Sequence, residues 1–273
     1  FDCTSLASIE IPDGVTSIGA YAFNGCTSLA SITVADNNQS YCDVDGVLFN
    51  KDKTELVQYP AGKTSASYSI PNSVTEIGDG AFSYCTNLKE IVIPDSVTWI
   101  GAYAFYGCTS LTSVVIPDGV TSIDDSTFDG CTSLASITIP DSVTSIGEYA
   151  FYGCTSLTNV VIPDSVKSIS SYGGGAFVNC PNLKCVTVPS SVERIGEYSF
   201  GYNGCSYYDS EKGETVDNFT ILGKSGTAAE TYANENGFTF IDLDNKNYNH
   251  TDNNSGIGVI AKADAELVVK EIS

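Results

Sequence analysis

Residues Ile93–Pro117 read IPDSVTWIGAYAFYGCTSLTSVVIP, and Ile139–Pro163 read IPDSVTSIGEYAFYGCTSLTNVVIP. The two segments are almost the same, and related copies lie before and between them. Prolines recur at positions 71, 94, 117, 140 and 163, and cysteines recur at 85, 108, 131 and 154, so the period is 23 residues. A fixed period of this length is the signature of a repeat architecture, in which each unit packs on its neighbours.

Each repeat ends in an alternating apolar segment, which in the copy over residues 94–116 consists of Leu111, Val114 and Ile116. Alternation predicts a short strand with one buried face, and the next proline ends it because proline has no N–H for a ladder. The Gly101–Phe105 segment has helical spacing for about one turn, which predicts a short helix or 3₁₀ turn. Since one unit cannot bury its own apolar face, we expect a parallel solenoid.

Stacking places equivalent side chains in columns, and the cysteine and phenylalanine columns should lie inside. These form the expected structural ladder of Cys85, Cys108, Cys131, Cys154, Phe105, Phe128 and Phe151. Parallel Cβ vectors suit a disulfide badly, so we expect free thiols that pack as small hydrophobic groups. Cys185 takes a strand position that should point outward, where it would be reactive. Cys42, Cys185 and Cys205 are compatible with either free or bonded thiols.

The full motif is Leu-x-x-Ile-x-Ile-Pro-x-x-Val-x-x-Ile-Gly-x-x-Ala-Phe-x-x-Cys, repeated through residues 1–205. It resembles the leucine-rich repeat of the BspA-like bacterial surface proteins. The resemblance implies an α/β fold: a right-handed leucine-rich-repeat solenoid with a parallel β-sheet on its concave face and short helical or 3₁₀ turns opposite. An irregular unit over about residues 35–70 resembles the hairpin-bearing variant of the same repeat, with a turn at Asn50–Lys53.

The pattern changes after Cys205. Residues 206–241 predict a strand, a helix and a strand, which resemble a terminal cap over the open end of the solenoid. Residues 242–273 are predicted to be a polar linker and the start of a further β module. The sequence also starts inside a copy of the motif and contains no methionine, so we expect it to be a fragment of a longer protein.

Composition excludes several functions. Thirty-three acidic residues against 12 basic ones give a net charge of −21, which opposes binding to nucleic acid or to an anionic membrane. No apolar run is long enough to insert into a membrane. The single histidine, His250, lies in an Asn/Asp-rich stretch, and no acid–base pair is apparent. We therefore predict no enzymatic activity and no cofactor.

An aspartate follows most of the prolines, which gives a column of Asp95, Asp118, Asp141 and Asp164. These carboxylates are typical acceptors for the N–H groups of a turn. The alternative is a row of weak calcium sites, because carboxylate oxygens suit calcium. One column supplies too few oxygens for each ion, so we favour the turn and predict no metal.

Two groups of side chains are candidates for contact with a partner. The outward strand positions include Val92, Val115 and Val161, which either form an ordinary sheet surface or meet a protein. The aromatic group comprises Trp99, Tyr103 and Tyr106, since Trp and Tyr dominate binding surfaces. Tyrosine columns also stack with one another and cover the flank of a solenoid.

These features predict a non-enzymatic module for protein interaction or adhesion. As the resemblance implies, the protein would be secreted or on the cell surface of a bacterium, and its partner would be a host or neighbouring-cell protein. One alternative is a passive spacer that carries another domain. Another is a carbohydrate-binding surface, which needs coplanar exposed rings.

Overall fold

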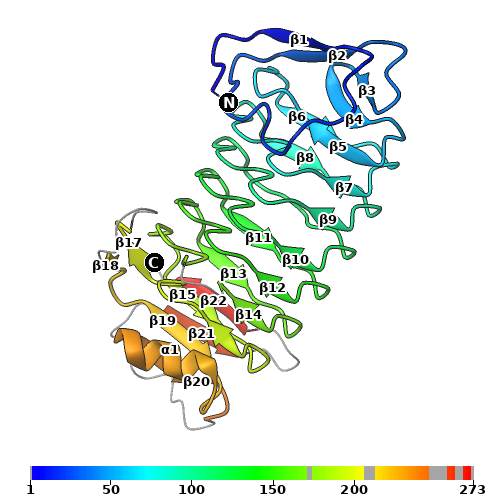
Figure 1. Ribbon diagram of the computed structural model, residues 1–273. Helices are drawn as coiled ribbons and strands as arrows, with labels where there is room; N and C mark the ends of the chain where they lie inside the picture. The colour runs from blue at the N-terminus through cyan, green and yellow to red at the C-terminus, as the bar shows by residue number, and fades with distance from the viewer. Residues whose placement is uncertain (1, 171–173, 206–212, 246–256, 262–266, 272–273) are drawn as a thin grey trace.

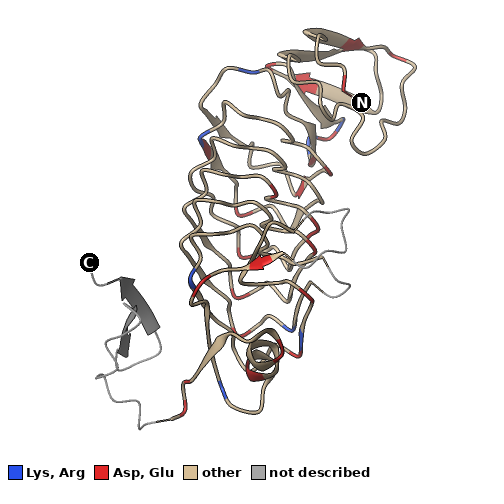
Figure 2. Ribbon diagram, turned by 90° about the vertical axis from the view of Figure 1, so that its left-hand side faces the viewer, with Lys and Arg blue, Asp and Glu red and all other residues tan. Residues whose placement is uncertain are grey.

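The computed structural model describes residues 2–170, 174–205, 213–245, 257–261 and 267–271 (Figure 1). The repeats form a parallel solenoid, an elongated rod in which each coil lies on the previous one. Asp and Glu residues occur along the length of the rod, and Lys and Arg residues are few (Figure 2). None of the helices in the described ranges is long and apolar enough to cross a membrane.

The first parallel ladder runs through the alternating segment before each proline, as the sequence predicts. Its pairs are in register one repeat apart, for example Ser136 with Asn159. Isolated bridges from Glu90 to Ser113 and from Val115 to Thr138 connect the pieces of the ladder. Its strands are β1 (Ser8–Ile11), β2 (Ser31–Val34), β6 (Ser67–Ser69), β8 (Glu90–Val92), β11 (Ser136–Thr138), β13 (Asn159–Val161) and β15 (Cys185–Thr187).

A second parallel ladder, which the sequence analysis did not predict, follows each proline turn. Its strands are two residues long in the regular repeats, too short to show alternation. Each is held by parallel pairing, for example Ser122 with Ser145 and Ile123 with Ile146. The strands are β7 (Glu76–Ile77), β9 (Trp99–Ile100), β10 (Ser122–Ile123), β12 (Ser145–Ile146), β14 (Ser168–Ile169) and β16 (Arg194–Ile195).

The third side of each coil is a chain of turns, where the sequence analysis predicted a helix or 3₁₀ turn. Tyr103 and Gly107 have φ angles of 57° and 68°, in the left-handed region that ends a right-handed helix. Some amides bond within the turn, such as Cys108 N–H to the Phe105 carbonyl at 3.1 Å. Others bond to the next coil, such as Phe105 N–H to the Thr127 carbonyl at 2.8 Å. The left-handed residues therefore direct hydrogen bonds along the rod.

The core contains a single stack of phenylalanine rings. Neighbouring ring centroids are 4.8–5.4 Å apart and the planes differ by at most 15° along Phe82, Phe105, Phe128, Phe151, Phe177 and Phe200. Each ring is buried, which stabilises the fold by roughly 1.5–3 kcal/mol. Beside them the column thiols donate to phenylalanine carbonyls of the preceding coil, as Cys131 does to Phe105 at 3.2 Å. None of the ten cysteines, which all lie in the described ranges, forms a disulfide.

The unit over residues 35–70 contains antiparallel strands β3 (Tyr41–Val44), β4 (Val47–Asn50) and β5 (Glu55–Gln58). The turn between β3 and β4 consists of Asp45 and Gly46, both with positive φ, as in the two-residue turns that suit a hairpin. The predicted hairpin between β4 and β5 is present. β5 then continues into the second ladder, because it pairs in parallel with β7.

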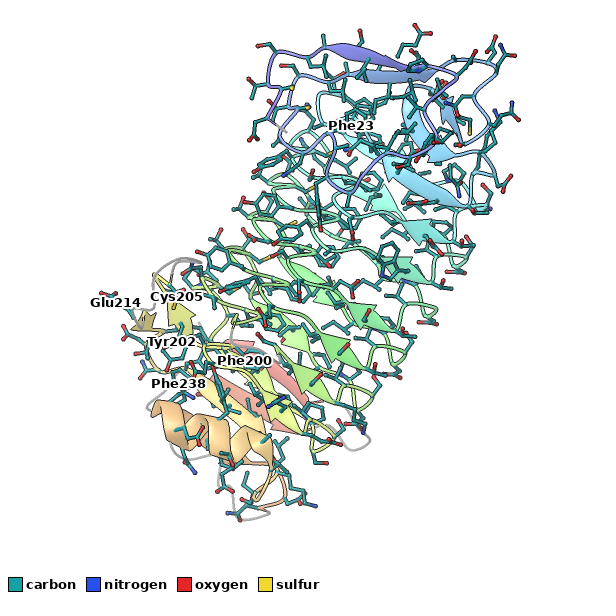
Figure 3. The ribbon with its side chains drawn as sticks, viewed as in Figure 1. Phe23, Phe200, Tyr202, Cys205, Glu214 and Phe238 are labelled. Carbon is teal, nitrogen blue, oxygen red and sulfur yellow. The ribbon has the colours of Figure 1, made fainter. Side chains whose placement is uncertain are left out.

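The C-terminal end of the solenoid is covered by β17 (Tyr202–Asn203), β18 (Glu214–Thr215), β19 (Thr220–Gly223), α1 (Ala228–Asn236) and β20 (Thr239–Asp242). β19 and β20 extend the first ladder beyond β15. The Tyr232 hydroxyl accepts from Phe200 N–H at 2.9 Å and donates to its carbonyl at 3.0 Å, so α1 closes the end of the ring stack. Phe200, Tyr202 and Phe238 lie between α1 and the last coils of the solenoid (Figure 3).

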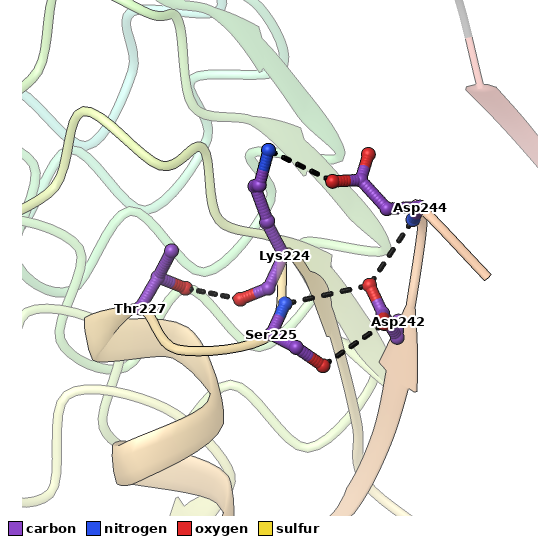
Figure 4. A network of polar contacts seen from close by, with 5 residues as sticks. All are labelled: Lys224, Ser225, Thr227, Asp242 and Asp244. Atoms are coloured by element: carbon purple, nitrogen blue, oxygen red, sulfur yellow. Dashed lines mark hydrogen bonds and ion pairs between the residues drawn. The ribbon is translucent and has the colours of Figure 1, made fainter.

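Polar contacts join the start of α1 to the end of β20 (Figure 4). The Ser225 hydroxyl donates to Asp242 at 2.9 Å, and Lys224 pairs with Asp244 at 2.8 Å. Both members of this ion pair are exposed, so the pair itself contributes little to the stability of the fold. Most of the predicted linker, residues 246–256, lies outside the described residues. β21 (Ile257–Ala261) and β22 (Leu267–Glu271) form an antiparallel hairpin.

Candidate functional site

The outward face of the first ladder carries the candidate valines. Val92, Val115 and Val161 are 61%, 73% and 62% exposed. Val115 and Val161 each pair with Thr138, so Thr138 lies between them on the face. The flanking outward positions are small or polar, namely Glu90, Ser113, Ser136 and Asn159. Parallel sheets are usually covered on both faces, so three exposed valines on one parallel ladder depart from the usual arrangement.

Trp99 begins β9 and is half-buried. Its indole Nε1 donates a hydrogen bond to Asp124 Oδ2 at 2.9 Å, and the Ser122 hydroxyl donates to the other carboxylate oxygen at 2.7 Å. Asp124 was not among the residues predicted to contact Trp99. The available signal was its position, where the adjacent repeats have Gly101 and Gly147.

The tyrosines form edge-to-face contacts along the flank. Tyr103 and Tyr106 have centroids 5.7 Å apart with planes at 62°, and Tyr106 meets Tyr84 at 86°. Tyr103 also meets Tyr21 of an N-terminal repeat at 5.4 Å and 88°. Rings crossed in this way stabilise one another. They do not present the coplanar platform that a carbohydrate surface needs.

The aspartates after the prolines remain exposed, each on its own turn. Within the described ranges, no group of three or more His, Cys, Asp or Glu side chains is arranged to hold a metal ion. This geometry gives the alternative of a calcium row at Asp95, Asp118, Asp141 and Asp164 no support.

Cys185 lies in the outward column, but the prediction that it could be reactive there was wrong. Its residue is only 9% exposed, and burial raises the pKa of its thiol. Thr220, its partner in β19, is also buried at 4%, so the outward column is covered where the first ladder enters the cap. A thiol that is both covered and protonated is a poor nucleophile.

Asp129 is a buried carboxyl that the sequence analysis did not single out. It is 3% exposed, and its Oδ2 makes no hydrogen bond to any described residue. Burial raises its pKa to about 7. The equivalent residues of the neighbouring coils are Tyr106 and Tyr152. Asp129 therefore has a carboxyl where those coils have an aromatic side chain that covers the flank.

The period, the parallel ladders and the stacked core define a leucine-rich-repeat solenoid. The model of the BspA type leucine rich repeat region matches residues 1–66 and 61–173 in six copies. The chain belongs to this family.

Solved structures agree with this assignment. The chain is 30% identical to a leucine-rich repeat protein from Eubacterium ventriosum, with a TM-score of 0.58 over 76% of this chain and 61% of the other. It is 35% identical to a leucine rich cell surface protein from Faecalibacterium prausnitzii, with a TM-score of 0.60 over 74% of this chain and 49% of that one.

The pneumococcal vaccine antigen PcpA shares the fold, at 23% identity and a TM-score of 0.55, over 87% of this chain and 56% of that one. This chain therefore spans about half to three fifths of the lengths of these proteins. No curated protein matches it.

Proposed function

We propose that this chain is a non-enzymatic protein-binding module, and that its contact surface is the valine face: Val92, Val115 and Val161 with the small residues between them. The exposure of these valines on a parallel ladder carries the proposal, because such a ladder is stabilised when its open face is covered. The face is flat and rich in Ser and Thr, which suits an extended partner surface better than a small molecule.

The family and the cell-surface relative from Faecalibacterium prausnitzii support a place on the surface of a bacterium. The partner in this proposal is a host or neighbouring-cell protein. The proposal also includes the finer architecture, which is a right-handed coil with the valine face on its concave side. The proposed division is a repeat domain over 1–205, a cap over 206–241, and a linker with a further module over 242–273.

The test is a binding measurement against purified extracellular-matrix proteins. We expect the double variant Val92→Lys/Val115→Lys to lose binding, because two charges would have to be desolvated at the contact. The matched control is Thr98→Lys/Thr121→Lys, which adds the same charge at exposed threonines beside the second ladder. Equal binding by both variants would exclude the valine face. An absence of binding in the wild-type chain would favour the spacer, and retention on a glycan array would favour a carbohydrate surface.

A further inference from the structure

A hollow of about 130 Å³ lies where the hairpin-bearing unit meets its neighbours. Its walls are the segment over residues 18–23 on one side, β5 in the middle, and the start of the loop after β7 on the other side. Trp99 stands at its edge. The space is large enough for a group bigger than a water molecule.

The hollow exists because one coil has a short third side. Leu56 pairs with Ile77, and Tyr59 stacks on Phe82 at 5.3 Å, so the two coils match at both positions. Between these positions the hairpin-bearing unit has two residues fewer than the coil that follows it. Tyr21, from the coil before, reaches across the gap and packs on Gly80 and Tyr103, without filling it.

The walls of the hollow are acidic. Burial raises the pKa of Glu55, and the nearby carboxylates Glu76 and Asp79 raise it further. Burial also raises the pKa of Asp79, an effect that its hydrogen bond from Ala102 N–H partly offsets. None of the residues that line the hollow is Lys or Arg.

The pKa of Tyr21 is raised by the same surroundings. Burial, followed by Asp79, Tyr103, Asp125 and Asp124, raises the pKa of its hydroxyl to about 12. The hollow therefore lies near several carboxylates, and no Lys or Arg among its lining residues offsets their charge.

The walls also carry aromatic groups suited to a cation. Trp99 is the residue whose ring attracts a cation most strongly, and its orientation is fixed by the hydrogen bond from Nε1 to Asp124. Tyr21 supplies a second ring to the lining. Carboxylates and aromatic rings around one hollow recognise an organic cation, because the first attract its charge and the second accept its apolar stem.

We propose that this acidic aromatic pocket, lined by Tyr21, Glu55, Asp79 and Trp99, binds an organic cation: the ammonium or guanidinium end of a Lys or Arg side chain in a basic peptide. An inorganic cation fits less well, since the described residues bring no three ligating side chains together. The pocket is beside the second ladder, whereas the valine face is on the first. The proposal is therefore independent of the proposed function.

The protein provides its own probe, because Trp99 is its only tryptophan. Selective excitation of Trp99 during titration with the tripeptides Gly-Lys-Gly and Gly-Arg-Gly should show a saturable change, with calorimetry as an independent measure of affinity. The acetylated peptide Gly-Lys(acetyl)-Gly has the same length without the charge and should give no change. Free n-butylamine separates the two sources of the cation: binding equal to that of the peptides shows that the pocket recognises the amine alone.

The decisive variant is Glu55→Gln, which removes a negative charge from the wall at nearly constant size; we expect its affinity for Gly-Lys-Gly to fall about tenfold. Asp79→Asn should act in the same direction. The matched control is Asp141→Asn, an exposed acid far along the rod, which should bind as wild type does. Thermal unfolding checks that each variant is folded.

Three results would overturn the proposal: equal binding by Glu55→Gln, equal binding of the acetylated peptide, or displacement of the peptides by calcium at lower concentrations. The absence of any binding would overturn it too. None of these results bears on the proposal for the valine face, because the matrix-protein assay does not involve Glu55.

Discussion

The regular repeats over residues 71–169 and the hairpin-bearing unit over residues 35–70 solve the same packing problem differently. In the regular repeats, each coil contributes one phenylalanine to the ring stack and one cysteine to the thiol column, and the core is continuous. In the hairpin-bearing unit, Tyr59 takes the ring position and a tight loop replaces the rest of the third side. There the buried residues separate into two clusters, the smaller of which contains Phe23, Leu29 and Ile32. Identical coils thus produce a single core, and one irregular coil divides it.

The largest expected effect is the loss of a ring from the middle of the stack. Phe128 lies between Phe105 and Phe151, at 5.3 and 5.4 Å, and is fully buried. We expect Phe128→Ala to lower the free energy of unfolding by about 3–5 kcal/mol, because it creates a closed cavity. Tyr59→Ala should cost less, about 2–4 kcal/mol, since this ring is at the irregular end of the stack. Denaturant unfolding measures both, and equal costs would contradict the distinction.

The next effect concerns Asp129. Its pKa is about 7 in the folded protein, against an ordinary value of 3.8. The folded state therefore holds a proton that the unfolded state releases, so the contribution of Asp129 to stability is greatest below pH 3.8 and falls as the pH rises to about 7. We expect Asp129→Asn to remove this slope and to stabilise the protein by about 1–3 kcal/mol at pH 8. Unfolding curves from pH 4 to 8 test this, and an unchanged slope would exclude Asp129 as its source.

A smaller difference should separate the two clusters. The strands β1 and β2 pack on the smaller cluster, so they should open without unfolding the rest of the rod. We expect their amides to exchange with solvent at least about tenfold faster than those of β11 and β13, a difference of about 1.4 kcal/mol. Hydrogen exchange read by mass spectrometry provides the comparison. Uniform protection along the rod would show that the core acts as one unit.

The smallest effect is on the surface. Val115 is 73% exposed, so Val115→Thr should change the free energy of unfolding by no more than about 0.5 kcal/mol. The same substitution should still weaken binding if the valine face is the contact surface. A large loss of stability would show instead that Val115 has a structural role.

The sequence predicts the part of the fold that depends on equivalence between repeats. The stack of Phe105, Phe128 and Phe151 follows from the period alone, because any parallel coil brings such residues together. The left-handed turn at Tyr103 does not follow, since tyrosine has no local preference for positive φ. That conformation is imposed by hydrogen bonds to the next coil, which the local sequence does not encode.

The candidate site shows the same limit. The exposure of Val92, Val115 and Val161 follows from strand alternation. The burial of Cys185 depends on the cap, and the pocket beside Trp99 depends on a loop that is two residues too short. Exceptions to the repeat, such as Asp124 and Asp129, are visible in the sequence as departures from the consensus. Their partners and surroundings become known only when the coils are stacked.

The buried thiol column has a consequence for where this protein can mature. The thiols of Cys108, Cys131 and Cys154 each donate to a main-chain phenylalanine carbonyl of the preceding coil, and burial raises the pKa of Cys131 and Cys154. Oxidants and reductants in the surroundings act on exposed thiolates. The packing of this column therefore involves no disulfide, and we expect it to be the same in a reducing and in an oxidising compartment.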